Sequence, residues 1–150
     1  MPLAIALTGA HVHDSNVFGL LYVTDVAIAV MKEQQSGHIV NISSVAGRTA
    51  RKGAGVYNAS KWAVNAFSES LRQEVTTKGV RISLVEPGAV ATELTDHITQ
   101  PEAKAASQQM YTSMRALHAE DVARAIVYVV TQPPHVAVNE VLVRPTDQER

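Results

Sequence analysis

The sequence predicts an α/β fold built on a doubly wound parallel sheet, and two patterns carry that prediction. Short apolar runs, of the length expected for buried strands, alternate with longer segments in which apolar residues recur every three or four positions. From Ser15 onward the predicted order is helix, strand, helix, strand, helix, helix, strand. Strands joined through helices pair in parallel, with helices packed on the sheet. A chain of 150 residues, 46% of them hydrophobic, is long enough to form one domain, residues 1–150, with its own core.

The first predicted elements are a strand and a helix. Residues 3–7 form a continuous apolar run that ends in Thr8-Gly9, which is typical of a buried strand. Ser15 is a candidate N-cap for the helix that follows, and Gly37 ends it. One apolar face of this helix is formed by Val17, Leu20, Leu21, Thr24, Ala27, Ile28 and Met31.

A strand over residues 38–43 and a long helix over residues 56–78 make up the centre of the chain. Ser44 lies at the carboxyl end of that strand, where open α/β sheets place their ligands. The loop between them carries three basic residues that we expect to be solvated, Arg48, Arg51 and Lys52. Gly79 caps the long helix. Small residues form a stripe along it, which would let another helix approach closely, either in the core or in a second subunit. The stripe consists of Ala59, Ala63, Ala66 and Ser70.

The remaining elements complete the sheet. A strand over residues 80–85 runs into an abrupt turn at Pro87-Gly88. Residues 99–102 form a capping-box pattern that opens a polar helix, extending to about Leu117 and typical of a mobile cover. An apolar helix over residues 120–130, a strand over residues 139–143 and a polar tail follow.

Composition excludes several classes of function. The net charge is −1 and the basic residues do not cluster, which argues against nucleic acids and anionic membranes as partners. The chain contains no cysteine, which excludes disulfides and thiolate metal sites and suits a cytoplasmic location. His11, His13 and Asp14 lack a third strong ligand at helical spacing, so we expect a polar connection there and no metal. No apolar run is expected to span a bilayer.

Tyr57 and Lys61 are the residues with the clearest chemical potential. They are four positions apart in a predicted helix, so the phenol and the ammonium share a face. Half-ionising an ordinary phenol at pH 7 requires about 4 kcal/mol. One ammonium at about 4 Å supplies a stabilisation of that order at an effective dielectric constant of 20. Such a phenol can act as a general acid or base, and the hydroxyl of Ser44, thirteen residues upstream, can hold the reacting oxygen.

Four segments in the same order resemble the short-chain dehydrogenase/reductase family. The resemblance extends from Ser15 to Pro145 and implies a truncated, Rossmann-like sheet. The matching segments are Asn16-Val17-Phe18-Gly19, residues 37–44, Tyr57-Asn58-Ala59-Ser60-Lys61 and residues 85–92.

The resemblance implies a catalytic group of four residues. Tyr57 would be the general acid/base, and Lys61 would lower its pKa and bind the nicotinamide ribose. Ser44 would orient the substrate carbonyl, and Asn16 would hold a water molecule that links Lys61 to solvent. Besides Tyr57 and Lys61, the residues implied in contacting the nicotinamide end of the cofactor are Pro87, Gly88, Val90 and Thr92.

The same resemblance implies an oxidoreductase that uses NADP or NAD on a carbonyl or alcohol. Residues 139–146 are similar to the branch that includes NADP-dependent 3-hydroxy-acid dehydrogenases, which favours NADP. A homo-oligomer is also implied, paired through the helices that begin near Ser15 and Val56.

The chain departs from the family pattern at its start. Thr8-Gly9-Ala10 could begin the glycine-rich phosphate turn, but His11-Val12-His13 follow where further glycines are required. Residues 3–7 could instead replace the strand before the Asn16 helix. On either interpretation most of the nucleotide-binding half is missing. Two hypotheses remain: a catalytic oxidoreductase, and a non-catalytic remnant that acts only as a folded association module.

Overall fold

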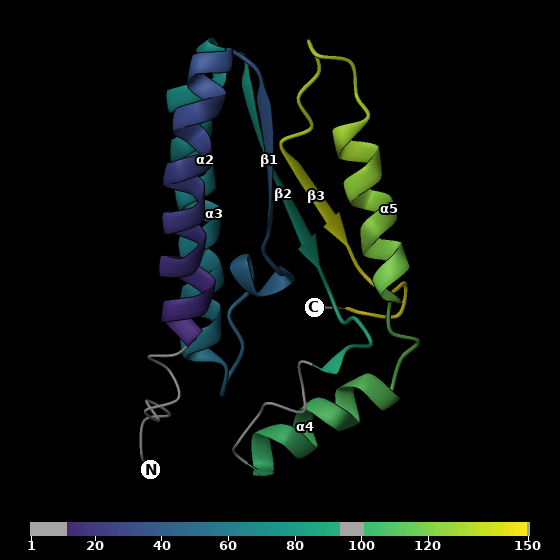
Figure 1. Ribbon diagram of the computed structural model, residues 1–150. Helices are drawn as coiled ribbons and strands as arrows, with labels where there is room; N and C mark the ends of the chain where they lie inside the picture. The colour runs from purple at the N-terminus through teal and green to yellow at the C-terminus, as the bar shows by residue number, and fades with distance from the viewer. Residues whose placement is uncertain (1–11, 94–100, 150) are drawn as a thin grey trace.

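The computed structural model describes residues 12–93 and 101–149. The predicted alternation of helices and strands is present (Figure 1). The elements are η1 (Asp14–Gly19), α2 (Leu20–Gln34), β1 (Gly37–Ile42), η2 (Val45–Gly47), α3 (Gly55–Val75), η3 (Thr76–Lys78), β2 (Val80–Pro87), α4 (Pro101–Thr112), α5 (Ala119–Val130) and β3 (Glu140–Val143). The strand predicted over residues 3–7, His11 and the predicted cap at Thr99 and Gln100 lie outside the described residues.

The three described strands form a parallel sheet in the order β1-β2-β3, which confirms the predicted fold class. Gly37 pairs with Val80 at one end of the β1–β2 ladder and Ile42 pairs with Val85 at the other. Figure 1 shows α2 and α3 on one side of the sheet and α5 on the other, with α4 beyond the carboxyl ends of the strands. The central strand β2 is buried along almost its whole length, as its apolar sequence predicts.

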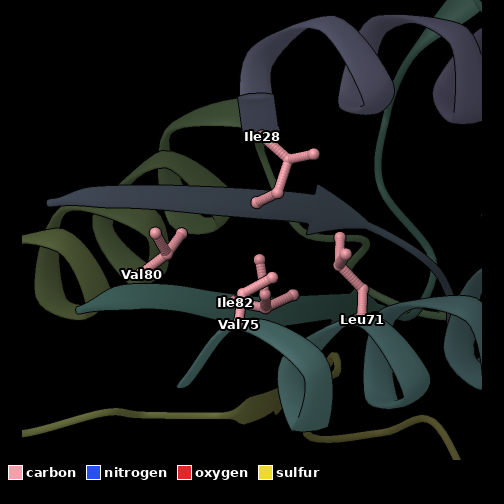
Figure 2. Close-up of a cluster of buried hydrophobic side chains, with 5 residues drawn as sticks. All are labelled: Ile28, Leu71, Val75, Val80 and Ile82. Atoms are coloured by element: carbon pink, nitrogen blue, oxygen red, sulfur yellow. The ribbon is translucent and has the colours of Figure 1, made fainter. Parts of the chain in front are cut away.

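A hydrophobic cluster joins α2 and α3 to the sheet (Figure 2). Its buried members are Ile28, Leu71, Val75, Val80 and Ile82. Full burial of an aliphatic side chain of this size stabilises a fold by about 1.5–3 kcal/mol. Ile28 lies on the predicted apolar face of α2, so this face is confirmed as the inward one.

The helix that leads into α2 differs from the prediction at both ends. The chain is already helical at His13, so Ser15 lies inside the π-helical turn η1 and is not an N-cap. At the other end, Gln35 adopts a left-handed conformation with φ 51°, so the helix ends at Gln34, three residues before Gly37. Gly79, with φ 72°, caps the short helix η3 that follows α3. A Cβ atom at Gly79 would lie 2.3 Å from the carbonyl oxygen of Gln35. These two left-handed residues therefore pack against each other.

One face of α2 is apolar and exposed. Its large side chains are between 51% and 72% exposed: Tyr22, Val23, Val26 and Val30. Among the described residues, the helical segment Asp14–Gln34 is long and apolar enough to cross a membrane, and only 11% of its most apolar stretch is buried. The expectation that no such run exists is therefore wrong. A helix that packs on another protein subunit meets the same criterion of length and composition.

Candidate active site

Lys61 lies between Tyr57 and the end of β1. Its Nζ is 5.9 Å from the centroid of the Tyr57 ring, which confirms that the two side chains share a face of α3. The ammonium donates a hydrogen bond to the carbonyl oxygen of Ile42 at 3.0 Å. Burial lowers the pKa of Lys61. The ammonium is thus held at the carboxyl end of β1 with the Tyr57 ring beside it, at the edge of the sheet where the sequence predicts a ligand site.

Asn16 joins this group from the π-helical turn. Asn16 and Lys61 both line a groove of about 490 Å³ between α2 and β1. The side-chain amide of Asn16 donates to Ser60 Oγ at 3.2 Å, and the fully buried Ser60 hydroxyl donates to the carbonyl oxygen of Tyr57 at 2.8 Å. The extra residue per turn of a π-helix often marks a functional position. Here it presents Asn16 to the helix that carries Tyr57.

Ser44 lies at the carboxyl ends of β1 and β2. Its backbone is extended and caps η2, with its hydroxyl oxygen accepting from the amide of Ala46 at 3.1 Å. The same hydroxyl donates to the carbonyl oxygen of Pro87 at 3.4 Å, and Ser44 is 8% exposed. The structure therefore brings a predicted catalytic residue next to the predicted cofactor turn.

Asn58 holds the loop that follows Ser44. Its side-chain amide donates to the carbonyl oxygens of Ala46 at 2.8 Å and Thr49 at 2.9 Å. Its carbonyl oxygen accepts from the backbone amide of Arg51 at 3.2 Å. Asn58 is 4% exposed and sits next to Tyr57, so one helical turn both carries the phenol and fixes the loop. Asn58 is not among the site residues that the sequence predicts.

A buried carboxylate, Glu86, connects the strands to the same loop. Glu86 is fully buried and accepts hydrogen bonds from Arg48 Nε and Asn65 Nδ2, both at 2.7 Å. Arg48 also pairs with Glu140 on β3. The hydrogen bonds that Arg48 donates to Glu86 and Glu140 raise the pKa of Arg48 above its ordinary value. The expectation that Arg48 is merely solvated is wrong, because the buried carboxylate requires a cationic partner.

Asn65 completes this network on the side of Ser43. Its Nδ2 also donates to the carbonyl oxygen of Gly47 at 3.3 Å, and its Oδ1 accepts from the hydroxyl of Ser43. A Cβ at Gly47 would meet the Asn65 amide at 2.9 Å. Close packing and hydrogen bonding therefore fix the backbone on both sides of Ser44. Two features of the sequence point to this network: Glu86 is a single carboxylate in an apolar strand, and Asn65 is an asparagine within the long helix.

The predicted cofactor turn follows β2. Gly88 N–H donates to the carbonyl oxygen of Val143 at 2.7 Å, which extends the pairing with β3 past Pro87. Val90 forms a parallel bridge with Leu117, and Thr92 is exposed. Leu117 therefore pairs with this turn. The helix predicted to extend to about Leu117 ends at Thr112.

Tyr111 on α4 faces the same region. Burial raises the pKa of Tyr111, the neighbouring Tyr57 raises it further, and Arg51 opposes the rise. Tyr111 is therefore a half-buried phenol that interacts electrostatically with Tyr57.

A model of the short chain dehydrogenase family matches residues 9–103, more than half of the chain. The chain belongs to the short-chain dehydrogenase family. An uncharacterised oxidoreductase of Staphylococcus saprophyticus is 41% identical to it over 137 residues, which cover 90% of this chain and 55% of the relative.

Solved structures of short-chain dehydrogenases share the fold. A serine dehydrogenase complexed with NADP+ is 36% identical with a TM-score of 0.84, and the match covers 92% of this chain and 56% of that one. A serine dehydrogenase from Escherichia coli is 33% identical with a TM-score of 0.73, over 90% of this chain and 52% of that one. The chain therefore spans about half the length of the relatives it matches.

The residues at this edge of the sheet suit the nicotinamide end of a dinucleotide. An ammonium carries three donors, and the hydrogen bond of Lys61 to Ile42 uses one of them. The others can serve the hydroxyls of a ribose.

Proposed function

We propose that this chain supplies the catalytic part of a short-chain oxidoreductase, which moves a hydride between NADP or NAD and a carbonyl or alcohol. The observation that carries the proposal is the position of the Lys61 ammonium between the Tyr57 ring and the end of β1. An adjacent positive charge stabilises a phenolate, which is the form Tyr57 takes after it donates its proton.

Each residue of the group then has a defined role. NADPH or NADH supplies the hydride to the carbonyl carbon in the direction of reduction. Tyr57 gives its proton to the carbonyl oxygen, and Ser44 donates a hydrogen bond that orients this oxygen. Lys61 holds the nicotinamide ribose, and Asn16 holds a water molecule that connects Lys61 to solvent. The residues proposed to contact the nicotinamide end are Tyr57, Lys61, Pro87, Gly88, Val90 and Thr92.

NADP is the favoured cofactor, and hydroxy acids are the first substrates to examine. The similar serine dehydrogenase is complexed with NADP+, and serine is itself a 3-hydroxy acid. This agrees with the resemblance of residues 139–146 to the 3-hydroxy-acid branch.

The second candidate function is that of a non-catalytic association module. It is favoured by the exposed apolar face of α2, whose large side chains are between 51% and 72% exposed. Much of the energy that places a nicotinamide comes from contacts remote from the reacting atoms. A single domain without those contacts would keep the fold and its surfaces and lose turnover.

In both cases we propose a homo-oligomer formed through α2 and α3 in a cytoplasmic protein. The exposed face of α2 carries Tyr22, Val23, Val26 and Val30, which is more apolar surface than a free helix usually presents to water. On α3, Ala59 and Ala66 are exposed and Trp62 is 51% exposed. Small residues flanked by a large aromatic ring let two helices pack closely.

A turnover assay with a single-atom variant tests the catalytic proposal. The chain is incubated with NADPH or NADH and a 3-oxo acid or a simple ketone, and the loss of reduced cofactor is followed by absorbance. Tyr57→Phe should lower turnover at least about 100-fold, since loss of a general acid costs about 10²–10⁴-fold. Tyr128→Phe, at an exposed position of α5, is the matched control and should retain turnover.

Calorimetric titration separates the two candidates. Micromolar binding of NADPH with turnover that depends on Tyr57 supports the oxidoreductase. A folded chain that binds neither NADPH nor NADH supports the association module.

A further inference from the structure

The segment after β3 was expected to be a polar tail, but it folds back onto the turn after β2. Pro145 is buried and Gln148 is 7% exposed, whereas Asp147 and Glu149 are exposed. The backbone amide of Gln148 donates to the carbonyl oxygen of Pro145 at 3.0 Å. This hydrogen bond closes a tight turn that directs the Gln148 side chain inward.

The side chain of Gln148 binds the backbone of the cofactor turn. Its Oε1 accepts a hydrogen bond from the buried backbone amide of Ala89 at 2.8 Å. Ala89 lies between Gly88 and Val90, two of the residues that the proposed function assigns to the nicotinamide end. A buried backbone amide needs a partner, and here a side chain 59 positions away in the chain supplies it.

Gly88 makes room for this carboxamide. A Cβ at Gly88 would lie 2.2 Å from Gln148 Oε1 and 3.2 Å from Arg144 Cγ. Any larger residue would therefore displace the carboxamide from Ala89. The hydrogen bond from Ala89 to Gln148 therefore depends on glycine at position 88.

Two further contacts hold the same turn from other directions. Gly88 N–H donates to Val143, and Leu117 exchanges two hydrogen bonds with the turn. The amide of Ala91 donates to Leu117 at 2.8 Å, and the amide of Leu117 donates to Ala89 at 2.9 Å. Val143 and Leu117 bind the turn through backbone atoms, whereas Gln148 binds it through its side chain. A substitution can therefore remove the Gln148 contact without changing the backbone.

We propose that Gln148 is a positioning residue, which fixes the turn at Gly88, Ala89 and Val90 in the conformation that receives the nicotinamide end of the cofactor. The role of Gln148 toward the cofactor rests on the proposed function. Its hydrogen bond to the backbone of the turn does not.

Amide hydrogen exchange in the full chain tests the hold. Gln148→Leu keeps the size of the side chain and removes the acceptor, so exchange at Ala89 should accelerate at least about tenfold, while exchange at the core residues Val64 and Val85 stays unchanged. Gln148→Glu keeps an acceptor oxygen and should restore most of the protection. Glu149→Leu, at the exposed neighbouring position, is the matched control. Unchanged exchange at Ala89, or equal acceleration at Ala89, Val64 and Val85, would overturn the proposal.

Gly88→Ala provides a second route to the same result. It should displace the carboxamide and accelerate exchange at Ala89, and it should add little further acceleration in the Gln148→Leu background. Full additivity of the two substitutions would contradict a shared arrangement.

NADPH titration of the same variants separates this proposal from the proposed function. Gln148→Leu should raise the NADPH dissociation constant at least about fivefold, and Gln148→Glu should restore it. Equal NADPH dissociation constants in the wild-type chain and in Gln148→Leu would overturn the role of Gln148 in cofactor binding. If the wild-type chain does not bind NADPH, the proposed function is wrong. The hydrogen bond between Gln148 and Ala89 then has a structural role only.

Discussion

The side-chain amide of Asn16 donates a hydrogen bond to the buried hydroxyl of Ser60 at 3.2 Å. This contact ties the π-helical turn to the helix of Tyr57, because Ser60 in turn donates to the Tyr57 carbonyl oxygen. Ser60 is therefore a positioning residue for Asn16 in the proposed reaction, although it does not face the substrate.

Ser60→Ala should lower turnover about tenfold and destabilise the fold by about 1–2 kcal/mol, since it leaves buried polar groups without a partner. Steady-state kinetics and urea unfolding measure the two effects. Ser70→Ala, at an exposed position of the same helix, is the control and should change neither quantity. Unchanged turnover in Ser60→Ala would contradict a positioning role.

The Arg48–Glu86 pair should be a major contributor to stability. Arg48→Met leaves a fully buried carboxylate without its cation and should cost about 3 kcal/mol, the lower end for a broken buried pair because Arg48 is 41% exposed. Urea unfolding of Arg48→Met and of the double variant Arg48→Met/Glu86→Gln provides the measurement. The double variant should be more stable than Arg48→Met, because its buried group is neutral.

The surface pair Arg72–Glu69 offers the matched control. The hydrogen bonds from Arg72 and Gln73 lower the pKa of Glu69 to about 2, but the pair is solvated. Arg72→Met should therefore leave the free energy of unfolding almost unchanged. Equal losses in Arg48→Met and Arg72→Met would contradict the structural role of Glu86.

His38 should make the fold sensitive to acid. Its Nε2–H donates to Ser83 Oγ at 2.8 Å, since that hydroxyl itself donates to the carbonyl oxygen of Val138 at 2.6 Å. Its Nδ1 is buried and has no hydrogen-bond partner among residues 12–93 and 101–149. Burial and the charge of Arg81 lower the pKa of His38, so the folded state favours the neutral ring.

Because the unfolded chain binds a proton more readily, stability should be constant above about pH 6.5 and should fall as the pH drops below that value. Urea unfolding between pH 7.5 and 5 measures this dependence. His38→Gln should flatten it, whereas His135→Gln, at an exposed position, should leave it intact. A wild-type dependence that persists in His38→Gln would show that another group is responsible.

Association through α2 predicts a different response from two exposed valines. Val26 on α2 is 70% exposed and Val127 on α5 is 57% exposed. Val26→Asp should convert the oligomer to a monomer at micromolar concentration, since a buried carboxylate opposes packing. Val127→Asp should leave the oligomer intact. Light scattering decides between the outcomes, and a wild-type monomer would contradict the proposed interface.

The strands and the Tyr57–Lys61 pair could be predicted because their signals are local. Buried parallel strands are apolar runs, so the predicted ends of β1, β2 and β3 lie within two residues of the observed ones. The spacing of Tyr57 and Lys61 within one helix places both on one face.

The remaining features depend on contacts between distant parts of the chain. Arg48 and Glu86 are 38 positions apart, and Ala89 and Gln148 are 59 apart, so neither pairing leaves a local pattern. Gln148 is surrounded by polar residues and reads as part of a tail until its contact with the turn is known. Helical periodicity also does not distinguish a π-helical turn from an α-helical one, so the sequence predicts a cap at Ser15 that the structure does not form.

The proposed function requires the described residues to form the nicotinamide end of a short-chain dehydrogenase site. An NMR titration with reduced nicotinamide mononucleotide, compared with adenosine 2′,5′-bisphosphate, tests it most directly. The mononucleotide should shift the backbone amide signals at Ser44, Tyr57, Lys61 and Val90, and the adenosine bisphosphate should leave them unchanged. Signals at these four residues that do not respond to millimolar reduced mononucleotide, in a chain that remains folded, would contradict the account.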